Sequence, residues 1–498
     1  MLTHTANGDS RLSLWRRVRE FAVPPSMIET ATVRRHAGDW AGACAAAGID
    51  VDLNLRSAAR VYGHDLATRV RADLRHLAPD LLRWHMPRIA PDGLLRPGLT
   101  LTLARYDIAT RDGARPVHLV VRTPPAWADG GQRISLALWD GSGPETGAPR
   151  HPHPRPSRRF RLDLHRHLWD ARRTDELRVR AGTGPPPADD PPGLPGHPGL
   201  PGTEPPGRRC AVDRWAAEAA ILLRAERRTA TGTGTGDGPG TGGGGDPGTG
   251  GGTGADIGTV AVRLGAGRRL AVELVADRDG AGPPTLRIET APTGGAASAL
   301  PVLPDAATWV PPDLELVRAG AIEAGRLHPL VASALVPDHV PTAPPRTPYP
   351  GSAQPPRLVD CRGVRHRIGI VDGVLVALDH DPAEVRREEL LAALTGTPLP
   401  CFQVIDEAHR RPECLPDIRE RLDHGDTAGA LAVVEDLLGA DACLRDGALR
   451  DELEAAVQRR ITYGMYRAGL DGPGPKRICP GPYRPRVTRS RPRHATRD

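Results

Sequence analysis

The stretch Gly98-Leu99-Thr100-Leu101-Thr102-Leu103-Ala104 marks the point where the hydrophobic pattern of the chain changes. Before it, apolar residues recur every three to four positions, a spacing typical of helices. From Leu99 onward they alternate with threonine and alanine, which is typical of a half-buried strand. A helical segment therefore gives way here to a β-rich one, and we expect an α+β multidomain fold.

On the N-terminal side, residues 11–90 are predicted to form a helical domain. Pro24-Pro25 should end the first helix, because proline cannot continue it. Ser26 and Glu29 have the capping-box spacing Ser-x-x-Glu, which predicts the start of a second helix. Asp39 can cap a third helix. A later helix is indicated by an apolar stripe at helical spacing: Leu66, Val70, Leu74 and Leu77.

On the C-terminal side, the β-rich middle is interrupted. Residues 91–180 and 257–340 are interpreted as one β-rich domain, with strands predicted at 99–103, 117–122, 133–139, 259–264, 270–275 and 285–289. Residues 181–256 are interpreted as a disordered insertion carrying one amphipathic helix at 212–227. Its flanks, 185–207 and 229–256, are rich in proline and glycine, and 14 of the 28 residues of the second are glycine.

The last part of the chain is predicted to be a Pro-rich linker (341–356), a mixed domain (357–472) and a basic disordered tail (473–498). The mixed domain opens with a β-hairpin that turns at Asp372-Gly373. A helix follows from Pro382, capped by Asp381, and the rest is expected to be helical. The fold class is therefore an N-terminal helical domain, an interrupted β-rich middle and a C-terminal hairpin with helices.

Composition places limits on the protein's surroundings. No run among the 498 residues approaches the roughly 18 apolar positions of a transmembrane helix. The polar N-terminus lacks the apolar core of a secretory signal. The seven cysteines are odd in number and scattered, which argues against a disulfide framework. We expect a cytoplasmic protein that does not enter a membrane.

The sequence Asp406-Glu407-Ala408-His409 matches the DEAH box of helicases. That carboxylate pair needs a phosphate cradle of the form Gly-x-x-x-x-Gly-Lys-Ser/Thr, N-terminal to it. The only lysine is Lys476, which lies C-terminal to the box and is followed by arginine. No Gly-x-Ser-x-Gly nucleophile elbow occurs either. We therefore nominate no catalytic residue and interpret the box as structural.

Potential metal ligands occur in two places. One contains two His-x-His pairs, and the other is a loose group near the predicted hairpin: His151, His153, His165 and His167, then Cys401, His409 and Cys414. No Cys-x-x-Cys pair is present, and tetrahedral zinc sites usually contain one. Neighbouring arginines would repel a cation at the histidines. The sequence therefore predicts no metal site and no cofactor.

Two hexapeptides agree at five of six positions: Gly38-Asp39-Trp40-Ala41-Gly42-Ala43 and Gly425-Asp426-Thr427-Ala428-Gly429-Ala430. Each reads as a turn, an Asp N-cap and a helix start; they are either a repeated motif or a coincidence between two capped helices. With Leu437-Leu438-Gly439-Ala440-Asp441, the second resembles an ankyrin repeat's second helix and the turn after it. This resemblance implies ankyrin-like helices. The whole chain resembles multidomain proteins of high-GC actinobacteria, which implies no particular activity.

These observations favour a non-catalytic protein-interaction or scaffold role. Two alternatives remain open. The tail from Lys476 to Asp498 carries a net charge of +7 and Arg150–Arg180 holds ten arginines against four acids, so a nucleic acid is a second possible partner. An enzyme of unrecognised type, with a site assembled from distant residues, is the third possibility.

Overall fold

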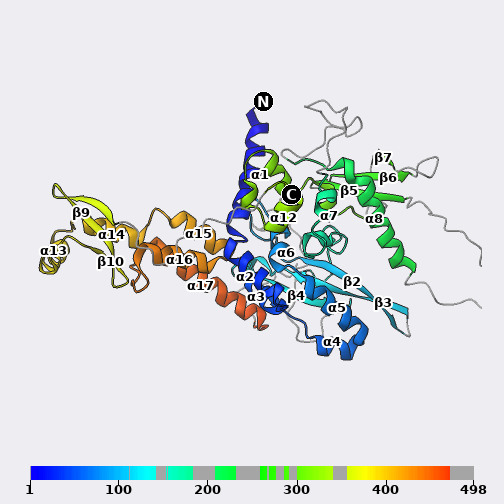
Figure 1. Cartoon of the computed structure of the whole chain (residues 1–498), viewed down its shortest axis with the longest axis horizontal. Coiled ribbons are helices and arrows are strands. Elements are labelled where there is room, and N and C mark those ends of the chain that lie inside the picture. The colour runs from blue at the N-terminus through cyan, green and yellow to red at the C-terminus, as the bar shows by residue number, and fades with distance from the viewer. Residues whose placement is uncertain are drawn as a thin grey trace, which may run out of the picture. The chain divides into compact units, whose positions relative to one another are not determined.

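The structure is a computed structural model that describes residues 2–110, 113–141, 153, 155–182, 208–231, 258–265, 268–275, 285–290, 300–339, 356–396 and 398–470. Helices and three separate sheets confirm the α+β multidomain class (Figure 1). The described residues form two compact units. The first unit takes in those of 1–126 and 134–340, and the second those of 127–133 and 341–479.

The first unit begins with helices and one short strand. These are α1 (Leu2–Phe21), α2 (Pro25–His36), α3 (Trp40–Ala46), β1 (Ile49–Val51), α4 (Leu55–Tyr62), α5 (His64–His76) and α6 (Pro79–His85). Helix α1 ends before Pro24-Pro25, as predicted. The predicted capping box at Ser26 is wrong, because Pro24 is the N-cap of α2 and no side chain caps that helix. Pro25 already occupies the first helical position, so Ser26 lies inside the first turn.

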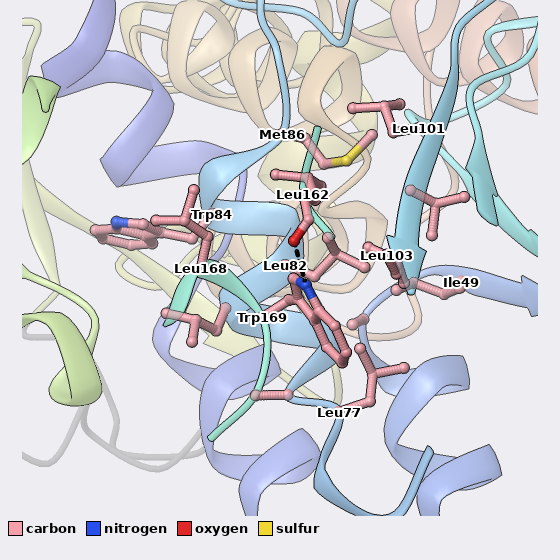
Figure 2. Packing of buried hydrophobic residues seen from close by; sticks show 14 of the residues in the cluster. Ile49, Leu77, Leu82, Trp84, Met86, Leu101, Leu103, Leu162, Leu168 and Trp169 are labelled. Carbon is pink, nitrogen blue, oxygen red and sulfur yellow. Dashed lines mark hydrogen bonds between the residues drawn. The ribbon is translucent and has the colours of Figure 1, made fainter. Parts of the chain in front are cut away.

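A mixed four-stranded sheet follows, with the strand order β1-β4-β3-β2. Its other strands are β2 (Thr100–Thr110), β3 (Gly113–Arg122) and β4 (Ile134–Trp139). They pair antiparallel, whereas β1 lies parallel to β4. The helical segment 11–90 and this sheet share one hydrophobic core (Figure 2). The predicted stripe of α5 belongs to it, with Val70 and Leu74 fully buried.

A second sheet in the first unit has a core of its own. Strands β5 (Gly258–Gly265), β6 (Arg268–Val275) and β7 (Thr285–Thr290) form an antiparallel meander. Helix α8 (Val212–Thr231) buries Trp215 and Leu222 in the same cluster as Val262 of β5. The amphipathic helix predicted at 212–227 is therefore confirmed, and its apolar face packs against this sheet.

Short helices complete the first unit: η2 (Arg166–Leu168), α7 (Glu176–Arg180), α10 (Asp305–Thr308), α11 (Pro312–Arg318), η3 (Ala324–Arg326) and α12 (Pro329–Leu335). A buried ion pair joins α1 to α11. Arg19 Nε donates to Asp313 Oδ1 over 2.7 Å, and Arg19 Nη2 donates to Asp313 Oδ2 over 2.9 Å. The Trp84 indole nitrogen donates to the same carboxylate over 3.2 Å. Helices α1, α6 and α11 of the first unit therefore meet at the Asp313 carboxylate.

The second unit contains a three-stranded sheet and helices, drawn from yellow to orange-red in Figure 1. Its elements are β8 (Arg357–Cys361), β9 (Val364–Val371), β10 (Val374–Ala377), α13 (Pro382–Thr395), α14 (Pro400–Arg410), α15 (Leu415–His424), α16 (Thr427–Leu438) and α17 (Ala448–Arg467). A 3-10 turn, η1 (Ala126–Ala128), lies where the chain passes between units. The hairpin turn at Asp372-Gly373 and the Asp381 cap of α13 are confirmed.

The two matching hexapeptides adopt the same local structure, each as a hairpin of two helices. Asp39 caps α3 by accepting from Gly42 N over 2.8 Å, and Asp426 caps α16 by accepting from Gly429 N over 2.9 Å. An arginine five positions earlier pairs with each cap. A glycine with positive φ precedes each cap and closes the preceding helix, as expected for an αL helix end.

Helix α16 ends at Gly439, as predicted, and Val434 and Leu438 are buried. The side chain of Leu431 is 43% exposed, because α16 packs on α15 through the Ala430 face instead. Gly439 has φ +95°, and a side chain there would overlap the carbonyl group of Gly373. The β9–β10 turn is therefore docked against the end of α16.

The predicted linkers and the basic tail fall almost entirely outside the described residues. Of the helices that the structure describes, none combines the length and the apolar character that a bilayer crossing requires.

Candidate metal centre

A turn in the first hairpin of the second unit brings the first two potential ligands together. Cys361 is the last residue of β8, and Arg362 and Gly363, with φ of 54° and 81°, turn the chain back into β9. Cys361 pairs with Val364, and Val359 pairs with His366. Side chains two positions apart on a strand share a face, so Cys361 and His366 lie on the same face of the sheet.

Two helix starts supply the other two side chains. His380 directly precedes Asp381, the N-cap of α13, and Cys401 is the second residue of α14 after Pro400. One ligand atom from each of Cys361, His366, His380 and Cys401 lies within 4.8 Å of all the others. The ring nitrogens His366 Nδ1 and His380 Nε2 are 2.6 Å apart. Two imidazole nitrogens this close share either a proton, in a hydrogen bond, or a metal ion.

The composition and the size of this cluster suit zinc. Two thiolates and two imidazoles form the Cys₂His₂ set of structural zinc sites. Around a tetrahedral ion at the usual bond lengths, neighbouring ligand atoms are about 3.3–3.8 Å apart. The four ligand atoms lie within 4.8 Å of one another, so shifts of about 1 Å or less would bring them to this spacing, with the two imidazole nitrogens moving apart by about 0.7 Å. Both thiols and His380 are buried, whereas His366 is half-buried.

The surroundings of the cluster also resemble those of a metal site. The second nitrogen of His380, Nδ1, lies 3.7 Å from Glu384 Oε2, one turn into α13. A carboxylate behind a ligating histidine fixes its tautomer and raises its basicity. Burial, and then the neighbouring Cys361 thiol, raise the pKa of Cys401 to about 11, so without a metal ion this thiol stays neutral. A bound cation would hold it as the thiolate.

A small hydrophobic core encloses the cluster. Cys361 and Cys401 are themselves part of it, together with Ile368, Leu399 and Ile405. The ring of Phe402 lies 5.9 Å from that of His380. An apolar shell of this kind limits access of water to the ligands. In this unit, the site and the core of the hairpin are therefore one structure.

Of the side chains considered from the sequence, Cys401 belongs to the cluster, and the other described ones lie elsewhere. Asp406 of the DEAH-like box is held by two arginines: its Oδ2 accepts from Arg410 Nε and its Oδ1 from Arg445 Nη1, both over 2.8 Å. His409, at the other end of α14, and Cys414, the N-cap of α15, are not part of the four-residue cluster. His165 Nε2 lies 3.3 Å from Glu218 Oε2 in the first unit.

No metal site is predicted from the sequence, yet the fold brings four potential ligands together. Their spacing, Cys-x4-His-x13-His-x20-Cys, contains no tight Cys-x-x-Cys pair. Strand β8, which carries Cys361, was not predicted. A usable signal did exist: a cysteine before an Arg-Gly turn, and a histidine directly before an Asp-Pro helix start. Both place a side chain at the end of an element, where ligands often converge.

Comparison with protein-family models, with curated proteins and with solved structures finds no match to this chain.

Proposed function

We propose that residues 357–410 form a zinc-binding module whose metal ion is structural, and that this part of the chain acts by binding rather than by catalysis. The observation that carries the proposal is the convergence of Cys361, His366, His380 and Cys401 within 4.8 Å. Four protein ligands complete the coordination sphere of a tetrahedral zinc ion and leave no position for water or substrate. The expected role of such an ion is to hold the hairpin against the starts of α13 and α14.

Metal content tests the first half of this proposal. Protein purified from zinc-supplemented cells should carry one zinc ion per chain by plasma mass spectrometry. Cys361→Ser and Cys401→Ser should each lose it, because a hydroxyl does not replace a thiolate ligand. Cys443→Ser is the matched control, since Cys443 is an exposed free thiol outside the cluster. Absence of zinc from the parent protein, or full retention in both ligand variants, would refute the site.

The second half of the proposal is a protein partner, as expected of a protein-interaction or scaffold protein. Helix α13 supports it, because Leu390 and Leu394 are 68% and 85% exposed. Leucines four positions apart lie on one helical face, the arrangement by which a helix inserts into an apolar groove of another protein. We propose that α13 is such a ligand helix. A cytoplasmic location belongs to the same proposal and fits the six described cysteines, which are all free thiols.

Affinity purification with a matched variant tests the partner. At moderate salt and after nuclease treatment, a protein should copurify with the parent in stoichiometric amount. Leu390→Glu/Leu394→Glu should lose that protein while it retains zinc and its melting temperature. Val457→Glu on α17, also an exposed position, is the control and should retain the partner. Equal recovery with the leucine double variant would exclude α13 as the binding element.

The nucleic-acid alternative gains no support from the described part of Arg150–Arg180. Six of its arginines form ion pairs within the protein: Arg159, Arg161, Arg166, Arg172, Arg173 and Arg180. Arginines held this way are partly neutralised and are poor phosphate ligands. The basic tail lies outside the described residues, and the ankyrin-like interpretation remains a prediction that rests on the α15–α16 hairpin.

A further inference from the structure

The first unit contains a cavity of about 570 Å³. Small-molecule sites commonly occupy about 300–1,000 Å³. Much of its wall is apolar and comes from distant segments: Trp15, Met86, Phe160, Leu162, Leu168 and Trp309. Figure 2 shows Met86, Leu162 and Leu168 in the cluster around Trp169. The cavity is therefore built into the main core of this unit.

One charged side chain in the cavity wall lacks a counter-charge. Arg88 lines the cavity and is 8% exposed. Its Nη2 donates to the Arg83 carbonyl over 2.9 Å and its Nη1 to the Gly93 carbonyl over 3.5 Å. Its Nε has no hydrogen-bond partner, and no carboxylate among the described residues pairs with it. Buried arginines are rare unless they are paired, so the wall holds an uncompensated positive charge.

Two further lining groups, one charged and one neutral, lack an acidic partner within ion-pair distance among the described residues. Arg214, also 8% exposed, donates from Nη2 to the Trp309 carbonyl over 3.1 Å and forms no ion pair among the described residues. His167 is buried, and its Nδ1 has no hydrogen-bond partner. Burial, and then the charges of His165, Arg180, His85 and Arg214, lower the pKa of His167 well below its ordinary value. The imidazole is therefore neutral in a positive field.

The cavity wall offers almost no negative charge in return. Asp305 is the one carboxylate among its described lining residues. It is already engaged, because its Oδ1 accepts from Arg159 Nε over 2.7 Å and its Oδ2 lies 3.7 Å from Arg208 Nη2. The cavity is therefore lined mainly by apolar side chains, and its uncompensated charge is positive.

We propose that this cavity binds a small organic anion that joins an acidic head group to an apolar body, with the head group on Arg88. A guanidinium with free N–H groups binds carboxylate in a planar fork, and the apolar wall takes up the rest of the ligand. The site is independent of the metal centre, since all its residues belong to the first unit.

Calorimetric titration of the full chain with decanoate, 1-decanol and inorganic phosphate tests this site. Decanoate should saturate one site per chain. Decanol, which has the same body without the charge, should bind at least tenfold more weakly, and phosphate alone should show no saturable binding. Equal affinity for decanol and decanoate would overturn the proposal, as would saturable binding of phosphate without an apolar body.

Substitution assigns the head group. Arg88→Met should weaken decanoate binding at least tenfold and leave decanol binding unchanged. Its melting temperature should be equal to the parent's or higher, because an unpaired buried charge is removed. Arg71→Met, at an exposed position of α5, is the control and should bind decanoate normally. If Arg88→Met does not fold, Arg88→Gln, which also removes the charge but keeps a polar side chain, provides the same comparison. Unchanged decanoate affinity in the folded variant would exclude Arg88 as the anion ligand.

Discussion

Both side chains of the Arg19–Asp313 ion pair are only 2% exposed. The guanidinium also donates to the Trp84 carbonyl over 2.6 Å and lies over the Trp84 ring, with its carbon 4.3 Å from the ring centre. All three guanidinium nitrogens of Arg19 and both carboxylate oxygens of Asp313 therefore have hydrogen-bond partners within the protein. A buried pair of this kind contributes little net stability relative to apolar residues, but the loss of one partner leaves a buried charge without compensation.

Arg19→Met should therefore lower the free energy of unfolding by about 3–5 kcal/mol, because Asp313 stays buried and unpaired. The double variant Arg19→Met/Asp313→Leu should recover much of that loss, since no buried charge remains. Urea denaturation of the first unit gives both values. A single variant as stable as the parent would show that the pair is not buried as described.

His85 makes the stability of the first unit dependent on pH. Burial, outweighing the attraction of Asp313, lowers the pKa of His85 to about 4, against about 6.5 in an unfolded chain. Between these values the unfolded chain binds the proton and the folded one does not, so stability falls as the pH drops from about 6.5 toward 4. The expected loss between pH 7 and pH 5 is on the order of 2 kcal/mol.

His85→Asn should flatten this dependence. The Asn amide can donate as His85 Nδ1 does to the Leu81 and Leu168 carbonyls, at 3.1 and 3.2 Å, but it does not titrate. His36→Asn, at an exposed position of α2, is the control and should keep the parent's slope. Denaturant titrations at several pH values measure the slopes. Identical slopes for His85→Asn and the parent would assign the pH dependence to other groups.

At the scale of elements, the hairpin α15–α16 depends on its cap. Asp426 is 7% exposed and accepts from Gly429 N, so Asp426→Ala should cost about 0.5–2 kcal/mol. Asp426→Asn should retain most of the cap, because an amide oxygen also accepts. Asp436→Ala, on the exposed side of α16, is the control. Thermal melts compare the three, and an unchanged melting temperature in Asp426→Ala would argue against the cap.

The sequence predicted elements better than it predicted what they assemble into. Helices ended by Pro24-Pro25, capped by Asp39 and Asp426, or closed by Gly439 were predictable, because caps and breakers act within one turn. Strands β1 and β8 were missed, since three to five residues carry too little periodicity. The exposure of Leu431 depends on which face of α16 meets α15, and that contact has no local signal.

The two candidate sites were beyond sequence reasoning for the same reason. The metal cluster draws on four elements across positions 361–401, and the cavity on segments from Arg11 to Pro312. Neither contains a short motif. The residue types were visible in the sequence: cysteine and histidine at element ends, and an arginine-rich composition in which many of the described arginines pair with acids. Arg88 is visible as an exception only once the neighbours are placed.

For the whole molecule, two units with separate cores predict two unfolding transitions. If zinc holds the second unit, a chelator should lower one transition strongly and leave the other in place, because metal-binding energy is folding energy where no site exists in the unfolded chain. Added zinc should restore the lowered transition. Differential scanning calorimetry measures both, and two transitions insensitive to chelator would contradict a structural metal ion.

The Arg19–Asp313 ion pair cannot form until both of its residues have been synthesised. Its partners are 294 positions apart, and translation at about 5–20 residues per second separates their appearance by about 15–60 s. During that interval α1 has been synthesised but α11 has not. The face of α1 that carries Arg19 and Trp15 therefore lacks its partner in α11. Ribosome-bound chains that stop before Pro312 should be cut by protease within α1, and chains that extend past α12 should be protected there. Helix α1 therefore gains its buried ion pair long after it is synthesised, and a chaperone that covers it would act on nascent chains shorter than this length.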